Sequence, residues 1–225
     1  MSRYPPDGML GPRAIAWWSL RSMTDGVRVE GLRNLPPSGP VLLVARHYHH
    51  LLDGAVLIRH LERPVHVVVA LDWTTNALQR RWMERACAWA RWPVVLRAGG
   101  VARGGAYSPA EVGRYVRRGL REAAALLGEG RVVAIFPEGY PVIDPSGTQP
   151  ETPRDGGGFL PFVPGFRTLL RLARRDGAGE VPIVPVGFAY VRRGRRWGVT
   201  ARLGAPLWAP AGLPAVERAV RELSA

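Results

Sequence analysis

Three of the five histidines of this chain stand within four positions of one another, at His47, His49 and His50, and Asp53 follows them. A carboxylate that accepts a hydrogen bond from one imidazole nitrogen leaves the other nitrogen basic, so such a pair can take a proton from a hydroxyl group. The segment follows the apolar run 41–45, and α/β sheets place their sites at the carboxyl ends of such strands. The residue types and their spacing therefore predict a histidine–aspartate general base.

The same histidines allow a second interpretation, metal binding. The string His47-x-His49-His50-x-x-Asp53 is similar to the ligand string of metallo-β-lactamases. A zinc hydrolase of that kind draws further histidine ligands from later loops. No histidine follows His66, so we expect no metal site.

Two further segments place notable residues at strand positions. Residues 136–139 follow an apolar run and set a glutamate before a glycine, which lets backbone approach a ligand closely. Residues 181–186 form an apolar strand that contains two prolines. Because proline is unusual in a central strand, this pattern alone favours an edge or irregular strand.

The elements that must position these residues alternate along the chain. Apolar runs predict strands at 27–31, 41–45, 64–70, 93–96, 132–136 and 181–190, with a hairpin-like pair at 192–203. Helical patterns cover 14–18, 50–61, 76–91, 109–127 and 165–175. This alternation predicts a single α/β domain with a mostly parallel central sheet flanked by helices. We expect residues 1–26 to form an N-terminal arm and residues 27–225 to form the domain.

Composition narrows the function classes. The formal net charge is +13, and all 31 basic residues are arginine. The absence of lysine excludes Schiff-base enzymes and ordinary P-loop NTPases. A field of this sign attracts nucleic acid, anionic lipid or acidic small substrates. The tryptophans are not interleaved with arginine along strands as base-stacking platforms require, so we do not expect a specific nucleic-acid partner. The single cysteine, Cys87, is expected to be a packing residue.

The tryptophans indicate contact with a membrane surface. No window reaches the roughly 18 consecutive apolar residues that span a bilayer, and residues 1–18 show no signal-peptide pattern. Tryptophan and arginine together suit the headgroup layer. The residues concerned are Trp17 and Trp18, then Leu78, Trp82, Ala86 and Trp89 at helical spacing, with Arg80, Arg81, Arg85 and Arg91 around them. The alternative is that these tryptophans belong to the core face of an amphipathic helix.

Taken in order, the segments resemble the PlsC-like lysophospholipid (1-acylglycerol-3-phosphate) acyltransferase family. Residues 31–44 are similar to the lead-in to its His-x-x-x-x-Asp motif, and Arg97 matches the arginine of its second motif. Residues 136–139 match the start of the third motif, 159–165 resemble its Pro-Phe-Lys-Pro-Gly segment, 181–186 match the fourth motif and 202–207 the closing strand. The likeness covers about residues 27–210. It implies a glycerol-phosphate acyltransferase-like fold, with residues 27–225 as the acyltransferase domain.

Two positions depart from the family pattern. Where the family has its histidine, five residues before the aspartate, this chain has Tyr48, whose phenol is a poor base. Alignment from the strand end makes His47 the base, whereas helical geometry favours His49, four residues before Asp53. The third motif lacks its arginine, because Tyr140 and Pro141 follow Gly139. Arg154 is the candidate replacement, unless the acceptor carries no phosphate.

The resemblance implies the reaction and its partners. The donor would be acyl-CoA or acyl-carrier protein, and the acceptor a hydroxyl of a lysophospholipid or related glycerolipid, with no cofactor and no covalent enzyme intermediate. The work would take place on the cytoplasmic side, at the inner face of the cell membrane. Because Tyr48 breaks the motif, a catalytically impaired lipid-binding homologue is the alternative. The implied site comprises the catalytic residues His47, His49 and Asp53 and the substrate-binding residues Arg97, Phe136, Pro137, Glu138, Gly139 and Pro185.

Overall fold

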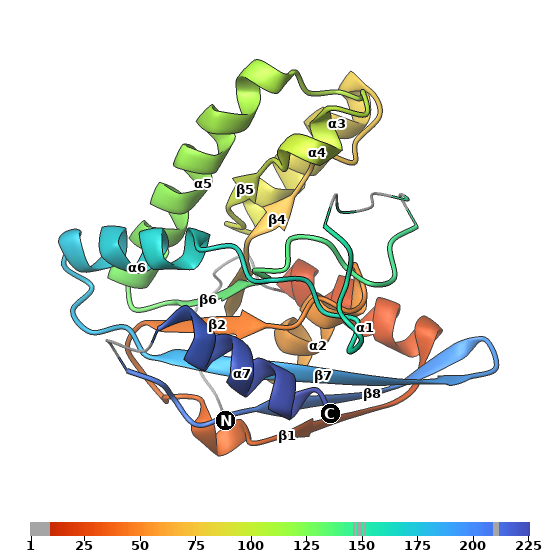
Figure 1. The fold of residues 1–225 in the computed structure, drawn as a ribbon, viewed down its shortest axis with the longest axis vertical. Coiled ribbons are helices and arrows are strands. Elements are labelled where there is room, and N and C mark those ends of the chain that lie inside the picture. The colour runs from red at the N-terminus through yellow and green to blue at the C-terminus, as the bar shows by residue number, and fades with distance from the viewer. Residues whose placement is uncertain (1–9, 146, 148–149, 151, 209–211) are drawn as a thin grey trace.

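A computed structural model describes residues 10–225 apart from 146, 148, 149, 151 and 209–211. Its centre is a six-stranded sheet in the order β1-β8-β7-β2-β6-β3 (Figure 1). β7, β2, β6 and β3 run parallel, while β8 pairs antiparallel with β7 and parallel with β1. The strands are β1 (Thr24–Glu30), β2 (Val41–Ala45), β3 (Val65–Val67), β6 (Val132–Ile135), β7 (Ile183–Arg193) and β8 (Arg196–Leu203). The predicted α/β class with a mostly parallel sheet is confirmed.

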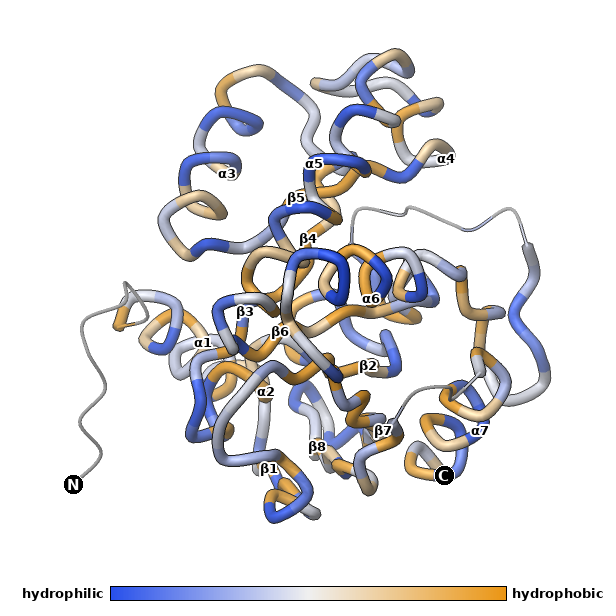
Figure 2. The backbone as a smooth tube through the Cα atoms, turned by 90° about the vertical axis from the view of Figure 1, so that its left-hand side faces the viewer, coloured by the Kyte–Doolittle hydropathy of each residue, from blue (hydrophilic) through white to orange (hydrophobic). Residues whose placement is uncertain are grey.

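β2 forms the middle of the core because every one of its side chains is apolar and buried. Successive side chains of a strand point to opposite faces, so Val41, Leu43 and Ala45 enter one hydrophobic cluster while Leu42 and Val44 enter another. In Figure 2, where the backbone is coloured by hydropathy, hydrophobic (orange) segments lie along the central strands. The first cluster includes residues of α1 (Leu10–Met23) and α2 (Leu52–His60). The second includes residues of α5 (Pro109–Gly128), α6 (Gly165–Arg175) and α7 (Leu213–Leu223).

A smaller unit, which we call the α3–α5 lobe, extends from one side of the sheet (Figure 1). It contains β4 (Val69–Ala70), α3 (Ala77–Trp89), β5 (Val94–Val95), α4 (Ala98–Val101) and the N-terminal half of α5. β4 and β5 form a separate two-stranded parallel sheet. The lobe has its own hydrophobic cluster, made of Leu71, Cys87, Leu96, Val101, Tyr107 and Tyr115.

The ends of the lobe helices follow from their sequences. Asn76 caps α3, since its side-chain oxygen accepts a hydrogen bond from the Gln79 amide at 2.9 Å. Ser108 and Glu111 form a capping box at the start of α5, where Pro109 occupies the first turn. Each cap satisfies amide groups that have no partner within the first helical turn.

One strand prediction was wrong in its extent. The run 64–70 is not one strand, because β3 belongs to the central sheet whereas β4 belongs to the lobe. The change occurs where the Val68 amide still donates to Ala134 while the Val69 amide donates to Pro93. The predicted strand at 93–96 is present as β5, and it pairs with β4. β4 and β5 satisfy backbone hydrogen-bonding groups by pairing with each other, outside the central sheet.

The N-terminal end of the chain differs from the expectation as well, in the length of its helix. The N-terminal helix is longer than residues 14–18, since α1 runs from Leu10 to Met23 and leads directly into β1. Ala16 and Leu20 are buried against the core, and Arg13 donates to the carbonyls of Ile58 and Leu61 in and after α2. β1 therefore spans positions 26 and 27, where we had placed the boundary of the arm. Residues 1–9 of the arm lie outside the described residues.

The strand with two prolines is a central one, so the edge interpretation was wrong. β7 lies between β8 and β2, and Pro185 pairs with Val44 of β2. A proline lacks the amide that a central ladder needs. Regular pairing with β8 begins only at Val186, because β8 ends at Leu203. Pro185 therefore precedes the antiparallel ladder, where its missing amide costs no ladder hydrogen bond.

Candidate active site

His47 and Asp53 meet at the carboxyl end of β2. The segment between Ala45, the last residue of β2, and Leu52, the first of α2, curls around the Asp53 carboxylate. Asp53 Oδ2 lies 3.1 Å from His47 Nδ1 and accepts the amides of Tyr48 at 2.7 Å and His49 at 2.9 Å. The Asp53 side chain is fully buried, and His47 is 15% exposed. Because Oδ2 already accepts two amides, the proton of this contact belongs on His47 Nδ1.

His49 has a different environment. It precedes α2 rather than lying within it, so the premise that His49 and Asp53 share a helical face was wrong. Its Nδ1 accepts the amides of Leu51 at 3.3 Å and Leu52 at 3.4 Å, which places the ring at the start of α2. Burial lowers the pKa of His49 to about 4, so the ring is neutral near pH 7 with its proton on Nε2.

A backbone ladder holds the histidine segment from the opposite side. The Val142 amide donates to His47, the Ile143 amide to Tyr48 and the His50 amide to Ile143. His50 is exposed, and its Nδ1 lies 3.3 Å from the Ile143 carbonyl oxygen. The loop after the third motif therefore determines the conformation in which the histidines stand.

Phe136 and Glu138 contact the same segment. The Phe136 ring stacks on His47, with centroids 4.5 Å apart. Glu138 is buried and accepts the amides of His47 at 2.8 Å and Leu160 at 3.0 Å, and Arg154 Nη1 lies 3.4 Å from its second oxygen. Burial raises the pKa of Glu138. Both carboxylate oxygens thus connect segments of the protein itself.

The two arginines expected near the acceptor are also paired within the protein. Arg97 Nη2 lies 2.8 Å from the buried Asp72 carboxylate, and Arg97 Nη1 donates to the Gly139 carbonyl at 2.7 Å. A Cβ at Gly100 would stand only 1.7 Å from Asp72 Oδ2, so a glycine is required there. Arg154 donates to the carbonyls of Tyr140 and Pro141, in addition to Glu138.

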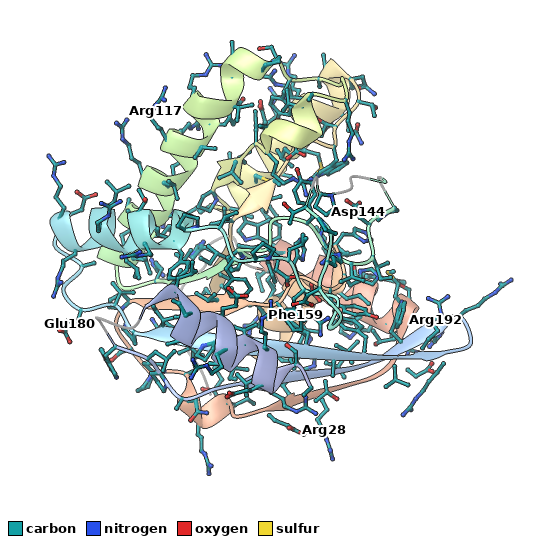
Figure 3. All side chains as sticks on the ribbon, viewed as in Figure 1. Arg28, Arg117, Asp144, Phe159, Glu180 and Arg192 are labelled. Atoms are coloured by element: carbon teal, nitrogen blue, oxygen red, sulfur yellow. The ribbon has the colours of Figure 1, made fainter. Side chains whose placement is uncertain are left out.

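The remaining predicted positions are part of the backbone that holds the His47–Asp53 site. Gly139 has a φ of 75°, which glycine adopts readily, and its amide closes a turn onto Phe136. Pro137 is buried and its carbonyl accepts the Val163 amide at 3.0 Å. Pro185 is buried in β7. Phe159 lies in the loop after Gly139 (Figure 3). Its ring has Arg46 at 3.9 Å and Arg221 at 4.5 Å.

Sequence reasoning missed two residues of this neighbourhood. Tyr190 of β7 places its hydroxyl 2.5 Å from Asp53 Oδ1, although the two residues are 137 positions apart. Asp72 pairs with Arg97 from 25 positions away. Asp72 follows the predicted strand 64–70, and its type and place were the only signal the sequence offered. Tyr190 had none, since it is the last residue of the predicted apolar strand 181–190, where packed tyrosines are common.

Cys87 is the buried packing residue that we expected, and burial raises its pKa to about 12, so the thiol stays protonated. Among the described residues, no group of three or more histidine, cysteine, aspartate or glutamate side chains is arranged to hold a metal ion.

Comparison with known proteins identifies the family. The profile of the Acyltransferase family matches residues 26–189. The fold is similar to the crystal structure of the 1-acyl-sn-glycerophosphate (LPA) acyltransferase PlsC from Thermotoga maritima, with a TM-score of 0.56 and 19% identity over 95% of this chain and 77% of that one. No curated relative matches the sequence. The likeness to that structure is one of fold, and the family profile covers most of the chain, which therefore belongs to the Acyltransferase family, as its motifs predicted.

Proposed function

We propose that this acyltransferase moves a fatty acyl group from acyl-CoA or acyl-carrier protein to a hydroxyl of a lysophospholipid or related glycerolipid. We assign His47 as the general base and Asp53 as the residue that orients it. The observation that carries this proposal is the 3.1 Å contact between His47 Nδ1 and Asp53 Oδ2. His49 is the weaker candidate, because its Nδ1 accepts amides and its Nε2 therefore holds a proton.

The reaction follows from the orientation of the His47 ring. With its proton on Nδ1, Nε2 carries the lone pair, and no described residue hydrogen-bonds to it. Nε2 takes the acceptor hydroxyl proton as the oxygen forms a bond to the thioester carbonyl carbon. The carbon–sulfur bond then breaks, and the thiolate takes the proton from His47, which returns the base to its starting state. No resident cofactor enters these steps.

The class of acceptor headgroup that we propose is wider than the phosphate-bearing headgroup that the family motifs imply. Arg97 and Arg154 both donate to backbone carbonyls in the segment 139–141, but each is also paired with a buried carboxylate. An arginine whose charge is already balanced contributes less to binding a phosphate dianion than an unpaired one. We therefore include acceptors with and without a phosphate monoester in the proposed substrate class.

An acyl-transfer assay with purified protein tests the proposal. Palmitoyl-CoA and palmitoyl-acyl-carrier protein are each combined with lysophosphatidic acid, lysophosphatidylglycerol and monoacylglycerol. We expect a diacyl product that disappears in His47→Ala and is unaffected by a chelator. Binding of these lipids without turnover by any combination would favour the lipid-binding homologue. Loss of turnover on chelation, with recovery on adding zinc, would favour the metal interpretation.

We further propose that the enzyme attaches to a membrane through a surface formed by α1 and α3, which we call the tryptophan surface. Its residues are exposed and apolar: Leu10, Ile15, Trp17 and Trp18 on α1, and Leu78, Trp82 and Trp89 on α3. Trp82 is 66% exposed and Trp89 55%, which is contrary to a core role. The helices touch, because a Cβ at Gly11 of α1 would stand 1.9 Å from the Trp89 ring.

Charge around this surface suits anionic lipid. Arg81 and Arg85 are exposed on α3. Arg80 points inward instead, to Glu111 at 3.0 Å, and so is not part of the surface. No helix in the described part of the chain is long and apolar enough to cross a bilayer. From the exposed tryptophans and arginines, we propose that the protein is a peripheral enzyme on the cytoplasmic, inner face of the cell membrane.

A further inference from the structure

Asp53 is bound through both carboxylate oxygens, but unequally. Oδ2 receives the amides of Tyr48 and His49 as well as His47 Nδ1. Among the described residues, Oδ1 has one hydrogen-bond donor, the Tyr190 hydroxyl at 2.5 Å. The Asp53 side chain is fully buried, so water does not replace that donor easily.

We propose that Tyr190 is the positioning residue of the His47–Asp53 pair. Its hydroxyl holds the Asp53 carboxylate at the rotation in which Oδ2 meets His47 Nδ1, and it stabilises the ionised form of that carboxylate. The inference rests on the acyl transfer proposed above, because the pair it positions is the proposed base.

The Tyr190 ring is held independently of its hydroxyl. It stacks on Tyr48 with centroids 4.6 Å apart and meets the Trp197 ring edge-on at 5.8 Å. Trp197 of β8 in turn lies under Arg192 at 4.6 Å. Arg192 lies near the end of the hairpin that joins β7 to β8 (Figure 3). Phenylalanine at position 190 would keep these contacts, so the hydroxyl can be removed with little change in packing.

Tyr190 acts as a donor throughout the working pH range. Burial and the Asp53 carboxylate raise the pKa of Tyr190 well above its usual value, so the hydroxyl keeps its proton. An ionised carboxylate has only acceptor oxygens, and the bond therefore runs from tyrosine to aspartate. Other ionisable groups surround the contact between Tyr190 and Asp53. They are Arg46, His47, Tyr48, His49, His50 and Arg192, and Glu138 accepts the His47 amide.

Removing the hydroxyl takes away the donor that stabilises the ionised carboxylate. Without a donor on Oδ1, Asp53 takes up a proton at higher pH, which abolishes its interaction with His47. This effect moves the acid limb of the pH–rate profile upward. A residue with a packing role alone would move stability and leave that limb in place.

The experiment compares Tyr190→Phe with Tyr115→Phe. Tyr115 is a matched control, because its buried hydroxyl also lies 2.5 Å from a carboxylate, that of Glu84 in the α3–α5 lobe. For Tyr190→Phe we expect kcat/KM to fall on the order of tenfold and its acid limb to rise by about one pH unit, the scale of one hydrogen bond to a charged group. Tyr115→Phe should lower the melting temperature and leave the pH profile of kcat/KM unchanged.

A second measurement separates this inference from the proposed reaction. In ¹⁵N-labelled protein without substrate, the midpoint of the His47 ring titration should differ between wild type and Tyr190→Phe. A wild type that shows no acyl transfer, but whose His47 titration responds to Tyr190→Phe, would contradict the proposed function and keep the positioning role. An unchanged His47 titration and an unchanged acid limb in a folded Tyr190→Phe protein would overturn the role of Tyr190.

Discussion

The central sheet and the α3–α5 lobe each contain a tyrosine hydroxyl 2.5 Å from a carboxylate: Tyr190 with Asp53 in the first, Tyr115 with Glu84 in the second. The other partners of the two carboxylates differ. Asp53 binds the ring of His47, whereas Glu84 binds Arg80, whose Nε lies 3.1 Å away. Asp53 also accepts backbone amides from the segment that carries the histidine.

This difference separates chemistry from structure. Arginine stays protonated in proteins, and the Glu84 network contains no group that changes protonation near neutral pH, so we assign it the structural role of joining α3 to α5. Histidine changes protonation near neutral pH, so the same kind of carboxylate contact in the sheet can drive proton transfer. A short hydrogen bond from tyrosine to a carboxylate therefore does not by itself identify a catalytic or a structural role. The role depends on the other side chain that the carboxylate binds, which is His47 for Asp53 and Arg80 for Glu84. The predictions below test that distinction, from the largest expected effect to the smallest.

The largest effect is expected at the base. His47→Ala should lower kcat by about a thousandfold, within the range of a lost general base. His49→Ala, its matched neighbour, should instead cost stability on the order of 1 kcal/mol, since its Nδ1 caps the start of α2. Acyl-transfer rates and thermal melts of both variants distinguish these outcomes. Equal activity in the two variants would mean that the contact with Asp53 does not select the base.

The next effect compares the two carboxylates directly. Asp53→Asn should reduce acyl transfer by at least about a hundredfold with the fold intact, because an amide neither orients nor stabilises the imidazolium as a carboxylate does. Glu84→Gln should retain wild-type kcat and melt at a lower temperature. Circular dichroism checks that both variants are folded. A large loss of kcat in Glu84→Gln would show that the lobe takes part in the chemistry.

The third prediction concerns the pH dependence of stability. Burial acts to raise the pKa of Glu84, but the hydrogen bonds from Tyr115 and Tyr107 and the pairing with Arg80 outweigh it and lower that pKa. A lowered carboxyl pKa adds stability above the unfolded value of about 4.3, and this stability is lost as the pH falls below that value. The melting temperature of wild type should therefore drop more steeply between pH 5 and 3 than that of Glu84→Gln. Parallel curves would contradict the prediction.

The smallest effect concerns the outer face of the lobe. The double substitution Trp82→Ala with Trp89→Ala should weaken sedimentation with phosphatidylglycerol vesicles by about tenfold without lowering kcat on a micellar acceptor. Trp208→Ala is the control, because Trp208 is 52% exposed but lies on neither α1 nor α3. Attraction by the exposed arginines, about 1 kcal/mol each near the surface, should fade as salt is added. Failure of the wild type to bind these vesicles at low salt would exclude the tryptophan surface as an attachment site.

Several features of this protein were determined by local sequence. The uniformly apolar run 41–45 produced a strand buried on both faces, because only a central parallel strand can bury such a run. His47 and Asp53 are six positions apart, close enough for one turn of chain between β2 and α2 to bring them together. The order of the motifs along the chain was sufficient to predict the family. Each of these depends on residues that are near one another in the chain.

Tertiary structure decided the rest, since it depends on partners that are distant in sequence. Which histidine meets Asp53 depends on the ladder between residues 47–50 and 142–143, and this ladder keeps His49 outside α2. The pairing of Arg97 with Asp72 depends on β4 leaving the central sheet to join β5, which no periodicity in 64–70 indicated. Tyr190 reaches Asp53 only because β7 lies beside β2. Strand order is set by how the whole core packs, and so these contacts could not be read from any one segment.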